Sequence, residues 1–177
     1  MDGNLRGLNI FLIGMMGSGK SSVGQVLAGR LGYRFFDADI VLERVAQTSI
    51  NDFFAREGES AFRDLESRVL GELAAQTRSV IATGGGAVLR RQNWSYLRHG
   101  LVVWLSAPVA VLAERLRGDE TRPLLKTEDL EGKLKTLLGE REALYQEADL
   151  MIEITSALST EEVAAQILAA LPRVLRS

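Results

Sequence analysis

The sequence contains no cysteine and only one histidine, His99, in 177 residues. The lack of cysteine excludes disulfide bonds, zinc sites built from thiolates and cysteine nucleophiles. His99 precedes Gly100, a residue suited to ending a helix, so we expect this imidazole at the surface. Any chemistry of the protein must therefore come from other side chains and from the backbone.

A strong charge of one sign is also missing, as are long apolar runs. Twenty-one Lys and Arg residues face 23 Asp and Glu residues, for a formal net charge of −2. This balance does not indicate general affinity for nucleic acid or for an anionic membrane. No apolar run is long enough to span a bilayer, and the first residues lack a secretory pattern. We expect a cytoplasmic protein that binds neither nucleic acid nor membrane.

Repeats, linkers and low-complexity segments are absent as well. The chain has an ordinary hydrophobic content of 46% and is long enough to bury a substantial core. We therefore predict a single domain over residues 1–177.

A phosphate-binding loop is the most specific feature that is present. Residues 14–21 fit the pattern G-x-x-x-x-G-K-[ST] at every fixed position. An apolar run over residues 8–13 predicts a strand before the loop, and residues 23–31 predict a helix after it. Strand, loop and helix in this order favour a phosphate site over a glycine-rich turn that binds nothing.

The residue types of this loop suit a magnesium-bound nucleoside triphosphate. Its glycines let backbone N–H groups surround an anion, and the helix start adds further N–H groups and a positive dipole end. Lys20 is predicted to reach the β- and γ-phosphates, and the Ser21 hydroxyl to ligate Mg²⁺. The residues of the loop expected to bind ATP are Gly17, Ser18, Gly19, Lys20, Ser21 and Ser22.

Strand and helix patterns alternate along the whole chain. Strands are predicted over residues 8–13, 33–36, 79–83, 101–105 and 150–154, and most of them are apolar runs buried on both faces. Helices are predicted over residues 23–31, 40–45, 59–76, 90–98, 128–147 and the C-terminal segment. This alternation predicts an α/β fold with a parallel sheet between two layers of helices.

Three serines are predicted to begin helices. Ser159 starts a capping box, and Ser49 starts a similar pattern, with Asp52 in place of Glu, for a short helix that stops near Gly58. Ser106 is followed by Pro108, an order typical of a cap and an early helical proline for a helix running to about Arg117.

Candidate site residues follow the ends of three predicted strands, where parallel sheets bind ligands. Asp37 and Asp39 would point to the same side if their segment stays extended. One carboxylate would then orient Mg²⁺ through water, and the other would accept hydrogen bonds from a substrate hydroxyl. The alternative is a helix N-terminus that favours acidic residues, and the position at a strand end favours a site.

Three consecutive glycines, residues 84–86, follow another strand. They exceed what a turn requires and suggest backbone that approaches a ligand, although a flexible turn is the alternative. Arg63 and Arg141, each taken alone, fit solvated helix charges. Arg122 precedes Pro123 in an irregular charged segment and is placed to fold over phosphates.

Together these segments resemble one family, the shikimate kinases. The segments that carry the resemblance are residues 14–21, 36–39, 62–66, 83–88, 121–125 and 141–145, and the resemblance covers essentially the whole chain. It implies a three-layer phosphate-loop kinase fold of the nucleoside-monophosphate-kinase group, with a five-stranded parallel sheet of order 2-3-1-4-5. It also implies a lid over about residues 118–126 and a helical substrate-binding region over about residues 37–66.

The resemblance implies that Mg²⁺-dependent transfer of the ATP γ-phosphate to the 3-hydroxyl of shikimate is the activity, on the route to chorismate and aromatic amino acids. Asp39 would hold shikimate hydroxyls and is a candidate base, and Arg63 and Arg141 would grip the carboxylate. The Gly85 N–H would bind a substrate oxygen, and Glu66 would orient Arg63.

On the nucleotide side, the resemblance implies that Asp37 reaches Mg²⁺ through water. Arg122 would be the lid arginine, and Arg115 would lie against the adenine. Two positions depart from the family pattern: Ser22 stands where Thr is common, and residues 154–158 contain neither the Asp nor the Pro often found there. We expect a monomer whose partners are the small molecules ATP and shikimate.

Two other functions are compatible with the phosphate loop. A different small-molecule kinase of the same fold, such as a gluconate kinase, would carry other substrate residues than Asp39, Arg63, Gly85 and Arg141. A non-catalytic nucleotide-sensing module would not need Lys20, Ser21 and the two aspartates together. A GTPase is not indicated, because the sequence has no N-K-x-D motif.

Overall fold

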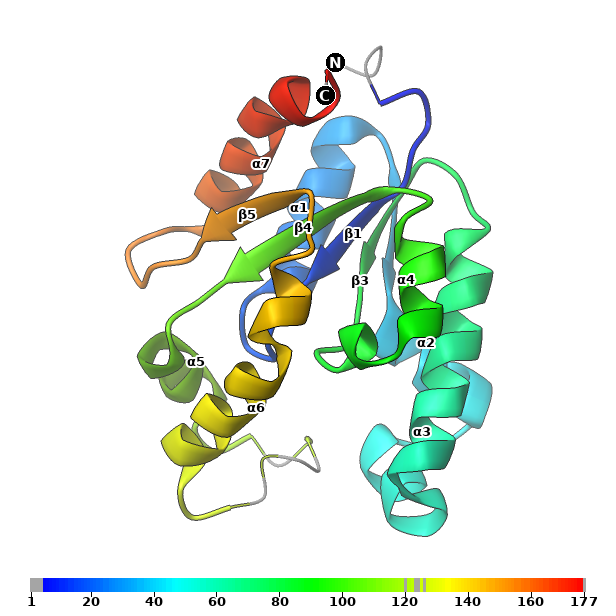
Figure 1. Ribbon diagram of the computed structural model, residues 1–177, viewed down its shortest axis with the longest axis vertical. Coiled ribbons are helices and arrows are strands. Elements are labelled where there is room, and N and C mark those ends of the chain that lie inside the picture. Colours follow the sequence, from blue (N-terminus) through cyan, green and yellow to red (C-terminus); the bar gives the residue numbers. More distant parts are fainter. Residues whose placement is uncertain (1–4, 120, 123–124, 126, 177) are drawn as a thin grey trace.

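A computed structural model describes residues 5–119, 121–122, 125 and 127–176. Five parallel strands form one sheet in the order β2-β3-β1-β4-β5, with helices on both of its faces (Figure 1). The strands are β1 (Ile10–Ile13), β2 (Arg34–Asp37), β3 (Ser79–Ala82), β4 (Leu101–Ser106) and β5 (Leu150–Glu153). The predicted fold class and strand order are therefore confirmed.

The helices cover the sheet in two layers. Their bounds are α1 (Lys20–Leu31), α2 (Ala38–Ala46), α3 (Ile50–Ala74), α4 (Arg91–Leu97), α5 (Val109–Leu116), α6 (Leu130–Tyr145) and α7 (Thr160–Val174), with a 3₁₀ turn η1 (Ala87–Leu89). Helix α1 packs against α7 on one face, and α3 packs against α4 on the other (Figure 1). No helix of the described residues is long and apolar enough to cross a membrane.

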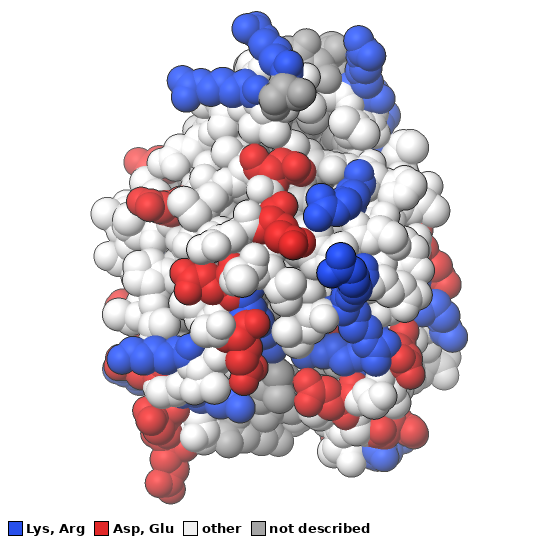
Figure 2. Space-filling model, in the orientation of Figure 1, with Lys and Arg blue, Asp and Glu red and all other residues white. Residues whose placement is uncertain are grey.

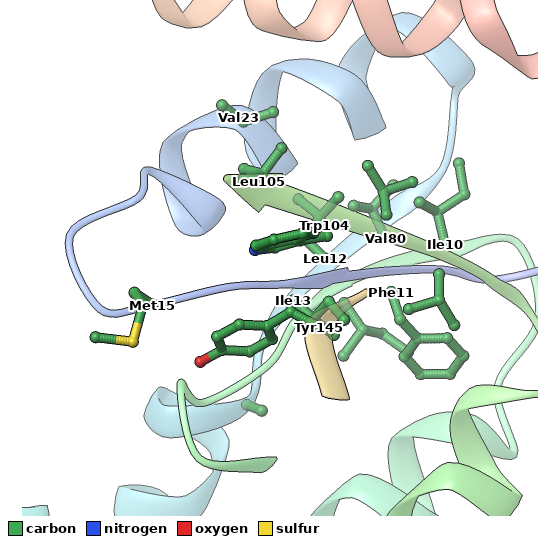
Figure 3. Close-up of a cluster of buried hydrophobic side chains, with 14 of the residues drawn as sticks. Ile10, Phe11, Leu12, Ile13, Met15, Val23, Val80, Trp104, Leu105 and Tyr145 are labelled. Atoms are coloured by element: carbon green, nitrogen blue, oxygen red, sulfur yellow. The ribbon is translucent and has the colours of Figure 1, made fainter. Parts of the chain in front are cut away.

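The core is centred on β1, the middle strand. It pairs with β3 through Ile10 and Val80 and with β4 through Ile10 and Leu101. Every residue of β1 and β3 is buried, as expected for inner parallel strands covered on both faces. Figure 3 shows side chains of β1 on both sides of the strand, packed among residues of β3, β4, α1 and α6.

Two of the three predicted serine caps are confirmed. The Ser49 hydroxyl accepts a hydrogen bond from the Asp52 N–H, and Ser159 forms a complete capping box with Glu162. The prediction for Ser106 is wrong, because this residue ends β4 and Pro108 is the N-cap of α5. Pairing of Ser106 with Glu153 in β5 extends the strand by one residue and so delays the helix.

A sharp bend divides α3 at Gly58. Its φ of 84° and ψ of 175° lie in a region that is open essentially to glycine alone. The predicted stop of a short helix near this residue is therefore confirmed. The bend folds the first part of α3 back, so that the Phe54 and Phe62 rings approach to 5.3 Å between centroids.

Candidate active site

A cavity of about 800 Å³ opens where the phosphate loop and the carboxyl ends of β2 and β3 meet. It brings together nearly all the predicted site residues, which come from the loop, β2, α2, α3, the glycine run, α5, the segment after α5, and α6. Those that line it are Gly17, Gly19, Lys20, Ser21, Ser22, Asp37, Asp39, Arg63, Gly84, Gly85, Gly86, Arg115, Arg122 and Arg141. The side chain of Ser18 is buried beneath the loop and does not line the cavity.

The phosphate loop is shaped around the head of Lys20. Gly17 and Gly19 have φ values of 80° and 95°, a region that other residues rarely adopt. The Lys20 Nζ donates to the carbonyl oxygens of Gly14 at 2.7 Å and Met15 at 2.9 Å. Because α1 begins at Lys20, within the loop itself, its free N–H groups face the same cavity.

The pKa of Lys20 is lowered to about 7, mainly by burial. The positive charges of Arg122 and Arg141 contribute to this shift, whereas Asp39 and Asp37 oppose it. The ammonium is therefore poorly compensated without a ligand. An added anion, such as a phosphate group, would stabilise the charged form.

Asp37 is fixed by contacts on both sides. The Ser21 hydroxyl donates to its Oδ2, while its Oδ1 accepts hydrogen bonds from the N–H groups of Asp39 at 2.9 Å and Ile40 at 3.2 Å. The segment therefore does not stay extended through residues 37–39, which was the condition for both carboxylates to point to the same side. The Asp37 carboxylate caps α2, which begins at Ala38, so the alternative of an acidic helix N-terminus also applies.

The oxygens of Ser21 and Asp37 suit a magnesium ion. Mg²⁺ prefers hard oxygen ligands and usually takes only one or two from the protein, the rest coming from phosphates and water. The described part of the chain has no group of three or more His, Asp or Glu side chains that could hold a metal.

Asp39 lies in the first turn of α2 and faces the cavity. Burial and the neighbouring Asp37 raise its pKa, whereas Arg122 and Lys20 act in the opposite direction. The Arg122 Nη1 lies 3.9 Å from the Asp39 Oδ2, and the Arg122 Nε lies 3.7 Å from the Asp119 Oδ2. The carboxylate therefore sits between the phosphate loop and the arginine of the expected lid.

Arg63 and Arg141 are buried, in contrast to the solvated charges that each would be if taken alone. Their exposed fractions are 7% and 1%. The Arg63 Nη1 donates to the Glu66 Oε1 at 2.7 Å, and the Arg63 Nη2 lies 3.7 Å from the Glu59 Oε1. Burial raises the pKa of Glu66, and the Arg63 charge opposes that rise.

Nitrogens of both guanidinium groups lack a partner. Among the described residues, the Arg63 Nε and the Arg141 Nε and Nη1 make no hydrogen bond although they are buried. A buried charged donor without a partner is costly. Two such groups facing one cavity therefore indicate a site for an anionic ligand, with fork geometry that suits a carboxylate.

The side chains around the site leave little room for a Cβ at the three glycines, least of all at Gly84 and Gly86. A Cβ at Gly84 would lie 2.6 Å from the Glu66 Oε2, and one at Gly86 would lie 2.6 Å from the Arg63 Cζ. One at Gly85 would lie 3.3 Å from the Arg141 Nη1. None of the three has a positive φ, so close approach, and not backbone conformation, explains the glycines.

Several cavity residues were not predicted. Ile40, Phe54 and Phe62 form an apolar wall, and Glu43 lies one helical turn after Asp39. The periodicity of α3 placed Phe62 in the core but gave no sign that it also lines a site. Tyr145 belongs to a segment that carried the family resemblance, yet nothing local assigned it a contact with the glycine run.

The predicted lid, residues 118–126, is only partly described. Glu120, Pro123, Leu124 and Lys126 lie outside the described residues. Of the remainder, Thr121 and Arg122 line the cavity, and Leu125 is buried in the core. Arg115, at the end of α5, is exposed and donates to the Gly17 carbonyl oxygen at 3.1 Å.

Comparison with known proteins supports one family. The shikimate kinase family model matches residues 16–172. A shikimate kinase of Rippkaea orientalis is 58% identical over 172 residues, 97% of this chain and 92% of that protein. A shikimate kinase of Microcystis aeruginosa is 53% identical over 173 residues, 98% of this chain and 91% of that protein.

A solved structure agrees. The shikimate kinase of Acinetobacter baumannii, in complex with shikimate, has a TM-score of 0.91 and 40% identity, covering 94% of this chain and 93% of that one. The family model spans most of the chain, and the relatives are aligned over nearly all of it. The chain belongs to the shikimate kinase family.

Proposed function

We propose that this enzyme transfers the γ-phosphate of ATP to the 3-hydroxyl of shikimate, giving shikimate 3-phosphate. The observation that carries the proposal is the pair of buried arginines with unpartnered nitrogens, in the same cavity as the phosphate loop. Shikimate has one carboxylate, which suits arginine forks, and ring hydroxyls, which suit a carboxylate and backbone donors.

In this proposal Arg63 and Arg141 hold the shikimate carboxylate, and Glu66 keeps Arg63 in place through their hydrogen bond. The amides of Gly84, Gly85 and Gly86 face substrate oxygens. Asp39 then accepts a hydrogen bond from the reacting hydroxyl, which either positions that group or takes its proton as the phosphoryl group arrives.

Lys20 and the loop amides bind the ATP phosphates, and Arg115 lies against the adenine. Ser21 would ligate Mg²⁺, with Asp37 reaching it through water. When bound, the ion would neutralise charge on the phosphates during transfer. The Ser21–Asp37 hydrogen bond holds both oxygens ready at the loop.

The lid belongs to this proposal. Arg122 already lies between Asp39 and Asp119, at the border of the two substrate regions. Closure of residues 118–126 over ATP would exclude water and bring the guanidinium to the transferring phosphate.

A monomer working in the cytoplasm, with ATP and shikimate as its partners, completes the proposal. On the face in Figure 2, acidic and basic side chains are interspersed over much of the surface, which does not suggest a nucleic-acid interface.

A panel of acceptors separates this function from that of a related sugar-acid kinase. Shikimate and gluconate are each incubated with the enzyme, ATP and Mg²⁺, and the product is followed by phosphorus NMR. We expect a phosphate ester only with shikimate. A phosphate ester formed only with gluconate would support the related sugar-acid kinase. Binding of ATP without formation of any ester would support a nucleotide-sensing module.

Replacing Arg141 by lysine is expected to raise the shikimate KM about tenfold or more, while kcat changes less. Lysine keeps the charge but loses the fork that grips a carboxylate with two nitrogens. Steady-state kinetics with each substrate varied in turn measure the effect. The exposed Arg98 offers a matched control, Arg98→Lys, which should leave both KM values unchanged. A loss confined to kcat would contradict the role given to Arg141.

Binding of an ATP analogue is expected to take up a proton at about pH 8. Lys20, with a pKa of about 7, is mostly neutral there in the empty site, and the phosphates favour its charged form. Below about pH 6 Lys20 is already charged, so the uptake should vanish. Calorimetry of a nonhydrolysable analogue in buffers of different ionisation enthalpy measures it. Equal uptake by wild type and Lys20→Met would refute this origin.

A further inference from the structure

The hydroxyl of Tyr145 joins the end of α6 to the glycine run. Tyr145 is fully buried, and its hydroxyl donates to the Gly85 carbonyl oxygen at 2.6 Å. Its ring stacks on Trp104 of β4, with 5.7 Å between centroids. Figure 3 shows the tyrosine oxygen pointing out of the apolar cluster that holds the ring. The ring is therefore fixed by packing, and its hydroxyl is directed at the Gly85 peptide group, with the Arg141 guanidinium acting on it as well.

That peptide group also carries the Gly86 N–H. A trans peptide is planar, so holding the Gly85 carbonyl toward Tyr145 turns the Gly86 N–H the opposite way. Glycines allow such a unit to rotate with little steric resistance, and here three are consecutive. Within the described residues, neither the Gly85 nor the Gly86 N–H donates a hydrogen bond. The Tyr145 bond therefore selects one orientation for the Gly86 N–H, an unpartnered donor of a residue that lines the cavity.

The same helix end also places a guanidinium group. Arg141 lies one turn before Tyr145, so both side chains leave α6 on the same side. A Cβ at Gly85 would lie 3.3 Å from the Arg141 Nη1, which has no partner among the described residues. Burial raises the pKa of Tyr145 to about 12, so its hydroxyl remains a donor at any working pH.

We propose that Tyr145 is a positioning residue for the acceptor substrate: its hydroxyl fixes the Gly85–Gly86 peptide so that the Gly86 N–H and Arg141 meet the same ligand. The inference rests on the proposed function only in taking that ligand to be shikimate. Tyr145 does not line the cavity and does not act on the phosphate groups. Its effect should therefore appear in the binding of the acceptor and not in the binding of ATP.

The test is Tyr145→Phe, which keeps the ring and its stacking on Trp104 but removes the hydroxyl. We expect the shikimate KM to rise about 3- to 10-fold, the factor for one net hydrogen bond, with the ATP KM and kcat nearly unchanged. Calorimetry of shikimate binding should show the same loss of affinity. All assays are run below the unfolding transition of each variant, which a thermal scan establishes first.

Tyr96→Phe is the matched control. The Tyr96 hydroxyl bonds to Gln92 within α4, outside the cavity, so its removal should change neither KM. Unchanged shikimate KM and affinity in Tyr145→Phe would overturn the inference, as would an equal rise of the KM for both substrates. If wild type does not phosphorylate shikimate, the proposed function fails instead, and the two failures are distinguishable.

Discussion

Replacement of Lys20 by alanine should lower kcat for shikimate phosphorylation about a hundred- to a thousandfold. Phosphoryl transfer depends on positioning and on positive charge around the oxygens of the moving group. The Lys20 Nζ is held by the Gly14 and Met15 carbonyl oxygens, so it is positioned before the substrate arrives. Alanine removes that charge, and no other lysine lines the cavity among the described residues.

The same substitution should not destabilise the empty protein. Burial lowers the pKa of Lys20, which means that the folded state binds its proton less well than the unfolded chain does. The wild type therefore gains stability as pH rises from about 7 toward 10.5, and Lys20→Ala should lose this rise. Lys135→Ala, at an exposed site on α6, is the control for kinetics and for unfolding. A Lys20→Ala enzyme with near-normal kcat would contradict the assignment.

Replacement of Asp39 by asparagine should lower kcat about a hundred- to ten-thousandfold, with a smaller change in the shikimate KM. Asparagine keeps the shape and the position in α2 but loses the charge that polarises the reacting hydroxyl. The arginine forks, which we propose hold the carboxylate, remain intact. Steady-state rates with saturating ATP and varied shikimate measure both constants.

The control is Asp64→Asn on α3, which removes a carboxylate from a surface pair with Arg90, the N-cap residue of α4. It should leave both constants unchanged. If Asp39→Asn alters only the shikimate KM and leaves kcat intact, the carboxylate binds the substrate without assisting transfer. That result would reject its role in chemistry.

Local patterns predicted the elements of the fold well. Apolar runs marked most of the five strands, and glycines marked helix ends at Gly32 and Gly58, both with positive φ. The strand order came from the family resemblance, because periodicity alone does not say which parallel strands are neighbours. The error at Ser106 has the same cause, since the partner that extends β4 lies in β5, 47 residues later.

The site was predictable where its chemistry is local. The phosphate loop is one continuous segment, so its spacing was sufficient. The burial of Arg63 and Arg141 could not be predicted from local sequence, because it depends on Glu66 and on the glycines that follow a different strand. The conformation of Asp37–Asp39 depended on a competition between strand and helix cap. The backbone N–H groups of α2 decided it in favour of the cap.

The most direct test of the account is ATP consumption by the purified enzyme with Mg²⁺, measured in a coupled assay with and without shikimate. Buried arginines with unpartnered nitrogens, beside a complete phosphate loop, lead us to expect fast turnover only when the acceptor is present. Turnover should saturate with shikimate and stop when shikimate is exhausted, one ATP being used per acceptor. Equal rates of ATP consumption with and without shikimate would contradict the central claim.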